Sequence, residues 1–138
     1  MGVGVNTGRT ESLLLSKACW LAPDGQWKSG GILIQNEKIC GLLTDDACQT
    51  FEEDERNSVL DCSDARILPG IIDSHTHFRE PGQKYKEGVD NGSKTALAGG
   101  VTTVLDMPNN IPAIASQEAL LGKKKMFRRL ARTNWGLY

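Results

Sequence analysis

The sequence has little net charge and no long apolar run. Its formal net charge is −1 over 138 residues, so charge gives no reason to expect nucleic acid or an anionic membrane surface as a partner. No apolar stretch approaches membrane-spanning length, and no apolar run after a basic start predicts a secretory signal. The one local excess of positive charge is expected to be a solvated helix face rather than a binding patch; it comprises Lys123, Lys124, Lys125, Arg128, Arg129 and Arg132.

The chain has four cysteines and two histidines, and their spacing argues against a zinc-binding knuckle. No two of the four cysteines are separated by two residues, and the two histidines lie far from them, which argues against a zinc knuckle. Free thiols in a chain without a secretory signal fit a reducing compartment. We therefore expect a cytoplasmic protein.

The first part of the chain predicts a small β-sandwich-like domain over residues 1–66, with a disordered start at 1–11. The segment 45–57 is acidic and polar, and we expect it to be a surface excursion. Strands are predicted at residues 12–21, 31–35, 39–43 and 59–62, the middle two forming a hairpin.

The pattern changes in the second part, residues 67–138. The run at 67–73 is apolar without alternation, which is typical of a strand buried on both faces. A helix is predicted at 83–98, a second buried strand at 101–106, a helix through about Ala131 capped by Ser116, and a third strand at 134–138. Strand and helix in alternation predict an α/β fold with a parallel sheet.

Both histidines lie at the end of the first of these strands. Alternate residues of a strand point to one face, so His75, His77 and Arg79 would project together if the strand continued to its end. Two adjacent imidazoles can hold a divalent metal, but a catalytic zinc site usually takes about three protein ligands. The remaining ligands would come from later strands, another chain, or carboxylates such as Asp73 and Asp106.

Two further polar residues could bind substrate at the same edge. Arg79 could hold a carboxylate through two parallel hydrogen bonds, although a surface ion pair is the simpler interpretation. Asn109 follows the second buried strand, at the end where parallel α/β sheets bind ligands. An asparagine beside proline can also serve only to form a turn.

These residues resemble a known family over residues 68–113. The runs LPGIIDSHTHFREPG and YKEGVDNGSKTALAGGVTTVLDMPNNIPA are similar to the amidohydrolase superfamily, specifically the cyclic-amide hydrolases headed by dihydroorotase. The DxHxH element is shared across the superfamily, whereas HxHxREPG together with MPN is narrower and resembles dihydroorotase. The preceding β-rich segment resembles the small domain before the barrel in this superfamily.

The resemblance implies a role for each matching residue. His75 and His77 would ligate one metal of a usually binuclear zinc centre, and Arg79 and Asn109 would hold the carboxylate of dihydroorotate. The implied reaction is reversible hydrolysis of a six-membered cyclic amide to N-carbamoyl-aspartate, in pyrimidine synthesis. Hydantoinase and allantoinase are near relatives, but Arg79 supplies a charge for a carboxylate that their substrates lack.

The resemblance also implies that parts of the enzyme are missing. A complete (β/α)₈ barrel needs about 250 residues, whereas 72 residues follow Arg66. We expect the opening of the barrel only, about two βα units and a third strand, with no catalytic base and no metal-bridging lysine. Such a chain would be inactive alone. Alternatively it would be a non-catalytic short form that binds a homologous subunit or a complementing barrel fragment.

Overall fold

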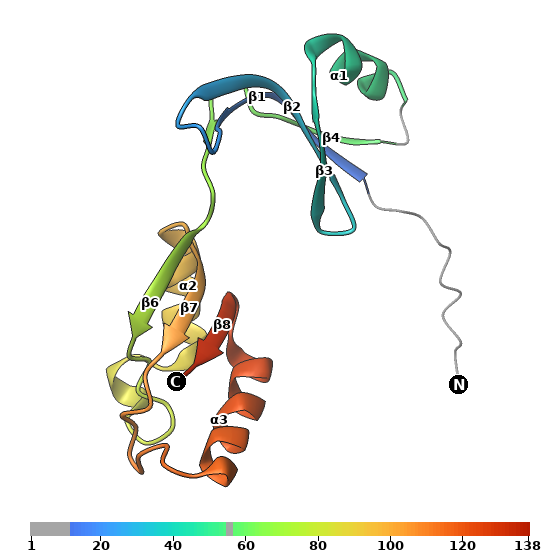
Figure 1. Ribbon diagram of the computed structural model, residues 1–138. Coiled ribbons are helices and arrows are strands. Elements are labelled where there is room, and N and C mark those ends of the chain that lie inside the picture. The colour runs from blue at the N-terminus through green and yellow to red at the C-terminus, as the bar shows by residue number, and fades with distance from the viewer. Residues whose placement is uncertain (1–11, 55–56) are drawn as a thin grey trace, which may run out of the picture. The chain divides into compact units, whose positions relative to one another are not determined.

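The computed structural model describes residues 12–54 and 57–138 (Figure 1). The disordered start predicted at residues 1–11 lies outside this part of the chain. The chain divides into two compact units, residues 1–69 and 70–138, and each is described by itself.

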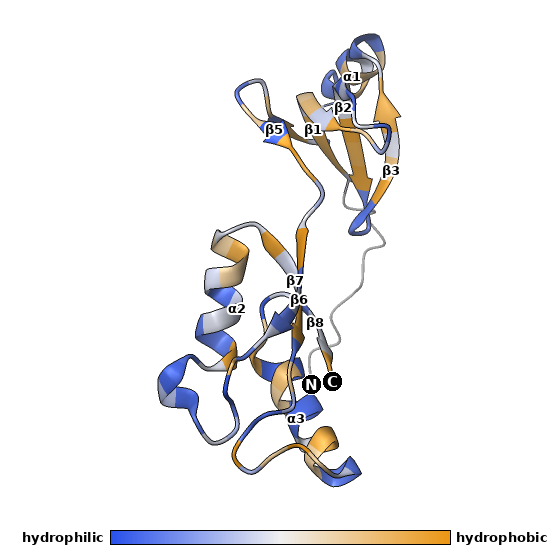
Figure 2. Cartoon of the chain, turned by 60° about the vertical axis from the view of Figure 1, so that its left-hand side comes forward, coloured by the Kyte–Doolittle hydropathy of each residue, from blue (hydrophilic) through white to orange (hydrophobic). Residues whose placement is uncertain are grey.

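The first unit is built on a mixed five-stranded sheet. Its strands are β1 (Ser12–Leu21), β2 (Trp27–Gln35), β3 (Lys38–Leu43), β4 (Ser58–Asp61) and β5 (Arg66–Ile67). The order is β3-β2-β1-β4, with β5 also paired to β1, and the pairs of β1 with β4 and β5 are parallel. The predicted hairpin is confirmed as β2 and β3, which Figure 2 shows joined by a hydrophilic tip. That tip is Asn36-Glu37, both with positive φ (49° and 62°), as a two-residue hairpin turn requires.

Two details of the first unit differ from the sequence prediction. The polar segment 45–57 contains a helix, α1 (Asp45–Glu52), whose Cys48 is buried. The run predicted as one strand at 67–73 is divided: Arg66–Ile67 pairs with β1, and the next strand begins only at Ile71. Pro69-Gly70 separates the two pieces, and proline cannot donate a ladder hydrogen bond.

The second unit is a parallel sheet in the order β6-β7-β8, with helices as crossovers (Figure 1). Its elements are β6 (Ile71–Thr76), the short 3₁₀ helix η1 (Lys84–Lys86), α2 (Val89–Ala98), β7 (Val101–Asp106), α3 (Gln117–Leu130) and β8 (Asn134–Leu137). The alternation predicted from sequence is confirmed. The first helix begins at Val89 rather than residue 83, whereas Ser116 caps α3 as predicted, accepting from Ala119 N at 3.1 Å.

The core of the second unit joins the sheet to its helices. Phe78, Val89, Val104 and Phe127 form the buried cluster, and the rings of Phe78 and Phe127 stack with centroids 6.0 Å apart. Ile72, in contrast, is 65% exposed, and five of the six residues of β6 are exposed. The apolar pattern of β6 is typical of a strand covered on both faces, and the described residues do not supply that cover, so its apolar side chains are bare. No described helix is long and apolar enough to cross a membrane.

Candidate metal and substrate site

The two histidines meet at the carboxyl end of β6. His75 is the penultimate residue of the strand, and His77 follows its last residue, Thr76. Their ring centroids are 5.0 Å apart and the ring planes are nearly perpendicular, at 75°. The spacing therefore brings the imidazoles together, as the sequence predicts.

His77 also contacts the end of the neighbouring strand. Its Nδ1 lies 2.9 Å from Oδ1 of Asn109, a residue 32 positions later in the loop after β7. Since a carboxamide oxygen only accepts hydrogen bonds, this contact is a hydrogen bond in the tautomer that carries its hydrogen on Nδ1. In a neutral ring the lone pair then lies on Nε2. Two of the predicted site residues are thus in direct contact, and the contact favours one tautomer of His77.

Arg79 lies in the loop after β6, where the strand geometry does not continue. The strand ends at Thr76, and Arg79 has a left-handed backbone, with φ 63°. Its carbonyl accepts from Gln83 N at 2.8 Å, and its guanidinium makes no hydrogen bond or ion pair with a described residue. The condition for Arg79 to project with the histidines by strand alternation is not met. Its role in binding substrate stays a prediction.

Asp106, one of the candidate carboxylates, contacts a lysine and a backbone amide. Its side chain is 1% exposed; Oδ1 accepts from Phe78 N at 2.8 Å and Oδ2 lies 2.7 Å from Lys123 Nζ. The other candidate carboxylate, Asp73, accepts from His75 N at 3.0 Å. Within residues 12–54 and 57–138, no three His, Cys, Asp or Glu side chains are grouped so as to hold a metal. Both oxygens of Asp106 are thus in contact with Phe78 N and Lys123, so that later strands or another chain are the simpler source of further metal ligands.

Lys123 does not lie on the solvated helix face that the sequence predicts for it, because its side chain is 0% exposed. The missed signal is helical spacing: Phe127 is four residues later and lies on the same face of α3, in the buried core. A lysine at a core-facing position must find oxygen partners, and Lys123 finds them at the end of β7.

A cavity adjoins the histidines. It has a volume of about 410 Å³, and the residues that line it include His75, His77, Asp73 and Glu87. Imidazole nitrogen is a good ligand for zinc. The donor set at this cavity therefore fits two ligands of a zinc site, with further ligands still required.

Comparison with known proteins places this arrangement in a family. Residues 66–126 match the family model described as "Amidohydrolase family". The chain is 45% identical over 91 residues to a dihydroorotase of Ehrlichia chaffeensis, covering 63% of this chain and 19% of that protein. It is 44% identical over 101 residues to a dihydroorotase of a Wolbachia from Drosophila simulans, covering 73% and 22%.

The chain belongs to the amidohydrolase family. It spans about a fifth of the length of the curated relatives it matches. Amidohydrolases are generally metal-dependent, which agrees with a pair of imidazoles beside a cavity.

Solved amidohydrolase structures share the fold. The L-hydantoinase (dihydropyrimidinase) from Arthrobacter aurescens aligns with a TM-score of 0.75 and 23% identity, covering 91% of this chain and 27% of that one. A D-hydantoinase gives a TM-score of 0.73 and 21% identity, over 91% and 26%. The α/β class and the first part of a (β/α)₈ barrel fold, both predicted from sequence, are confirmed.

Proposed function

We propose that this chain serves metal-dependent hydrolysis of a cyclic amide, with dihydroorotate and N-carbamoyl-aspartate as the substrate pair. The observation that carries the proposal is the contact between His77 and Asn109, which joins two strand ends beside the cavity. The dihydroorotase names of relatives 44–45% identical support this choice of substrate.

Each site residue has a distinct task in this proposal. His75 and His77 hold one zinc ion of a binuclear centre, and Arg79 and Asn109 bind the substrate carboxylate. Bound zinc would polarise the amide carbonyl and lower the pKa of a water. Asn109 keeps the hydrogen of His77 on Nδ1, so that Nε2 is free to act as ligand. A guanidinium suits a carboxylate because its donors form a planar fork.

A second candidate is a hydantoinase- or allantoinase-type reaction, favoured by the fold likeness to hydantoinases. Arg79 separates the two, since it matters only for a substrate with a carboxylate. In an assembled enzyme, Arg79→Ala should lower kcat/KM for dihydroorotate by about 100-fold, the loss expected for a charged bidentate contact of roughly 3 kcal/mol. Unchanged turnover of dihydroorotate would show that Arg79 does not bind the substrate carboxylate, and turnover of hydantoin or allantoin in place of dihydroorotate would favour the second candidate.

The described residues supply two histidine ligands, so we expect the chain to need a partner for activity. That partner would be a homologous subunit or a complementing barrel fragment that brings the other ligands and the catalytic base. A non-catalytic form that binds such a partner is the alternative, and the exposed apolar residues of β6 favour it: Ile71 is 57% and Ile72 65% exposed.

The experiment measures bound zinc and dihydroorotate turnover for the purified chain, alone and mixed with the unmatched part of a dihydroorotase relative. We expect turnover only in the mixture. His75→Ala and His77→Ala should each abolish it and lower the zinc content, whereas Lys124→Met, on the exposed face of α3, should change neither. Zinc content and turnover that do not respond to either histidine variant would refute the proposal. A mixture that associates without turnover would favour the non-catalytic alternative.

A further inference from the structure

Lys123 is a buried cation with three oxygen partners. Its Nζ lies 2.7 Å from Asp106 Oδ2, 2.8 Å from Met107 O and 2.9 Å from Asn110 Oδ1. The ammonium donates hydrogen bonds to Met107 O and Asn110 Oδ1, and Asp106 Oδ2 forms its ion pair. Asn110 is itself buried, at 6% exposed. The partners lie at the end of β7 and in the loop after it.

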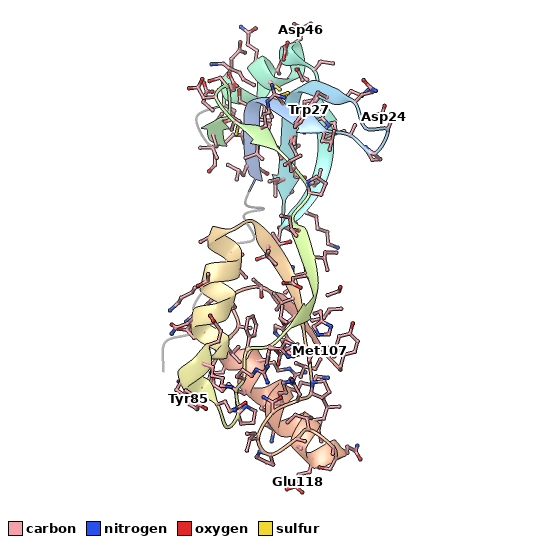
Figure 3. All side chains as sticks on the ribbon, turned by 90° about the vertical axis from the view of Figure 1, so that its left-hand side faces the viewer. Asp24, Trp27, Asp46, Tyr85, Met107 and Glu118 are labelled. Carbon is pink, nitrogen blue, oxygen red and sulfur yellow. The ribbon has the colours of Figure 1, made fainter. Side chains whose placement is uncertain are left out.

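The loop held by Lys123 carries Asn109. Two of the partners, Met107 and Asn110, flank Pro108-Asn109, and Met107 is labelled in Figure 3 where β7 passes into this loop. The loop is closed further by a hydrogen bond from Asn110 N to Pro108 O, at 2.9 Å. The amide of Asn109 is therefore presented to His77 by a segment fixed on both sides.

The same network holds the backbone next to His77. Asp106 Oδ1 accepts from Phe78 N at 2.8 Å while its other oxygen meets Lys123. Met107 N donates to Thr76 O at 3.0 Å, on the other side of His77. His77 is thus flanked by two residues tied to the end of β7, and its ring is tied to Asn109.

We propose that Lys123 is a positioning residue that fixes the tautomer of His77. By holding residues 107–110 it keeps Asn109 Oδ1 at the Nδ1 hydrogen, which leaves Nε2 as the ligand atom. That Nε2 of His77 binds a metal rests on the proposed function, whereas the tautomer of His77 does not depend on it. Lys123 acts through Asn109 and touches neither His75 nor His77.

The test reads the tautomer directly, by long-range ¹H–¹⁵N NMR of the histidine rings at a pH where both are neutral. The wild-type chain should show His77 with its hydrogen on Nδ1. The informative variant is the pair Lys123→Met with Asp106→Asn, which removes both buried charges and keeps an acceptor oxygen for Phe78 N. We expect a mixture of tautomers at His77 and a loss of zinc affinity of about 10-fold, the lower end for a residue that orients a ligand.

Control variants separate positioning from general stability. Lys124→Met removes the same charge from an exposed neighbour and should leave tautomer and zinc affinity unchanged. Asn109→Ala should reproduce the mixed tautomers with Lys123 intact. If the double variant does not fold, Asn110→Ser replaces it, since that change removes one oxygen partner and leaves the ion pair; it should mix the tautomers to a smaller extent.

A folded double variant, or a folded Asn110→Ser, that keeps the wild-type tautomer of His77 would overturn the inference. A wild-type chain in which His77 carries its hydrogen on Nε2 would also overturn it. If the tautomer responds as expected but zinc does not bind even in the mixture with the unmatched part of a dihydroorotase relative, the positioning role stands and the proposed function fails.

Discussion

At the scale of single residues, the end of β7 determines how His77 is held. Asp106 and Lys123 are both almost fully buried, and their ion pair is 2.7 Å long. Burying two charges is costly unless their remaining hydrogen-bonding groups are satisfied. Here Phe78 N, Met107 O and Asn110 Oδ1 satisfy them. This buried network of charged and polar groups therefore lies directly beside the candidate site.

Lys123→Met should destabilise the second unit strongly. It leaves the Asp106 carboxylate buried without its cation, and breaking such a pair costs about 3–5 kcal/mol in free energy of unfolding. Lys124→Met, one position along the same helix and exposed, should stay within about 0.5 kcal/mol of wild type. Urea unfolding of the two variants measures the difference. Equal stabilities would show that the ion pair does not form in solution.

Gly82 lies in the loop after β6, and Gly100, between α2 and β7, provides a control for substituting it. Both have positive φ, at 100° and 83°. A Cβ on Gly82 would lie 1.8 Å from Ile111 O, whereas one on Gly100 would meet nothing within 4 Å. Gly100→Ala should therefore cost only the backbone strain of about 1–2 kcal/mol. Gly82→Ala should cost about 1–3 kcal/mol more, from the clash. Similar melting temperatures for the two variants would mean that the loops do not approach so closely.

At the scale of elements, α2 is tied to the segment between α3 and β8. Asp90, in the first turn of α2, pairs with Lys94 at 2.6 Å and with Arg132 Nε at 3.0 Å. The hydroxyl of Ser93, one turn later, accepts from Arg132 N at 3.0 Å. These contacts join the two crossover helices on the side of the sheet where Phe78, Val89, Val104 and Phe127 are buried.

The Asp90 contacts predict a pH dependence of stability. Hydrogen bonds from Lys94 and then Arg132 lower the pKa of Asp90 below its usual value. The folded state therefore binds fewer protons in acid than the unfolded state, and stability rises with pH. The contribution should be complete above the unfolded pKa of about 4 and be lost as the pH falls through the lower folded value.

Asp90→Asn tests that dependence. Its melting temperature should lie below that of wild type near pH 6, and the gap should close as the pH is lowered below about 4. Thermal unfolding followed by circular dichroism over pH 2.5 to 6 gives both curves. A gap that stays constant over this range would show that the charge of Asp90 makes no contribution.

At the scale of the whole molecule, the two units bury different cores and expose different apolar residues. The first is centred on Ala18, Ile32 and Cys62, and the second on the cluster around Phe127. Ile71 and Ile72 remain exposed on β6. Contiguous exposed apolar side chains on a strand favour association.

We expect the purified chain to self-associate through β6. Ile72→Lys should reduce the associated fraction without lowering the melting temperature, because Ile72 is 65% exposed. Val104→Lys, at a position 1% exposed on the neighbouring strand, should instead unfold the second unit. Sedimentation velocity and thermal unfolding separate these effects. If Ile72→Lys leaves association unchanged, another surface is responsible.

Much of the second unit could be predicted because its information is local. The β-branched run Val101–Asp106 forms β7 with the predicted bounds, and Ser116 caps its helix. The approach of His75 and His77 also follows from short-range spacing. The sequence does not show which residues the tertiary structure buries. The apolar pattern of β6 is typical of a buried strand, yet most of its residues are exposed, and the basic run 123–125 contains one buried lysine, Lys123.

The sequence by itself determined the alternation of strands and helices in the second unit, the pair of histidines at a strand end and the resemblance to amidohydrolases, because periodicity and motif spacing act over a few residues. Only the tertiary structure decided that Asn109 meets His77 across 32 residues, and that Asp106 pairs with Lys123. Those contacts depend on β6 and β7 lying in register, with α3 packed against them. The physical reason is that the free energy of burying a charge depends on which oxygens the fold brings near it.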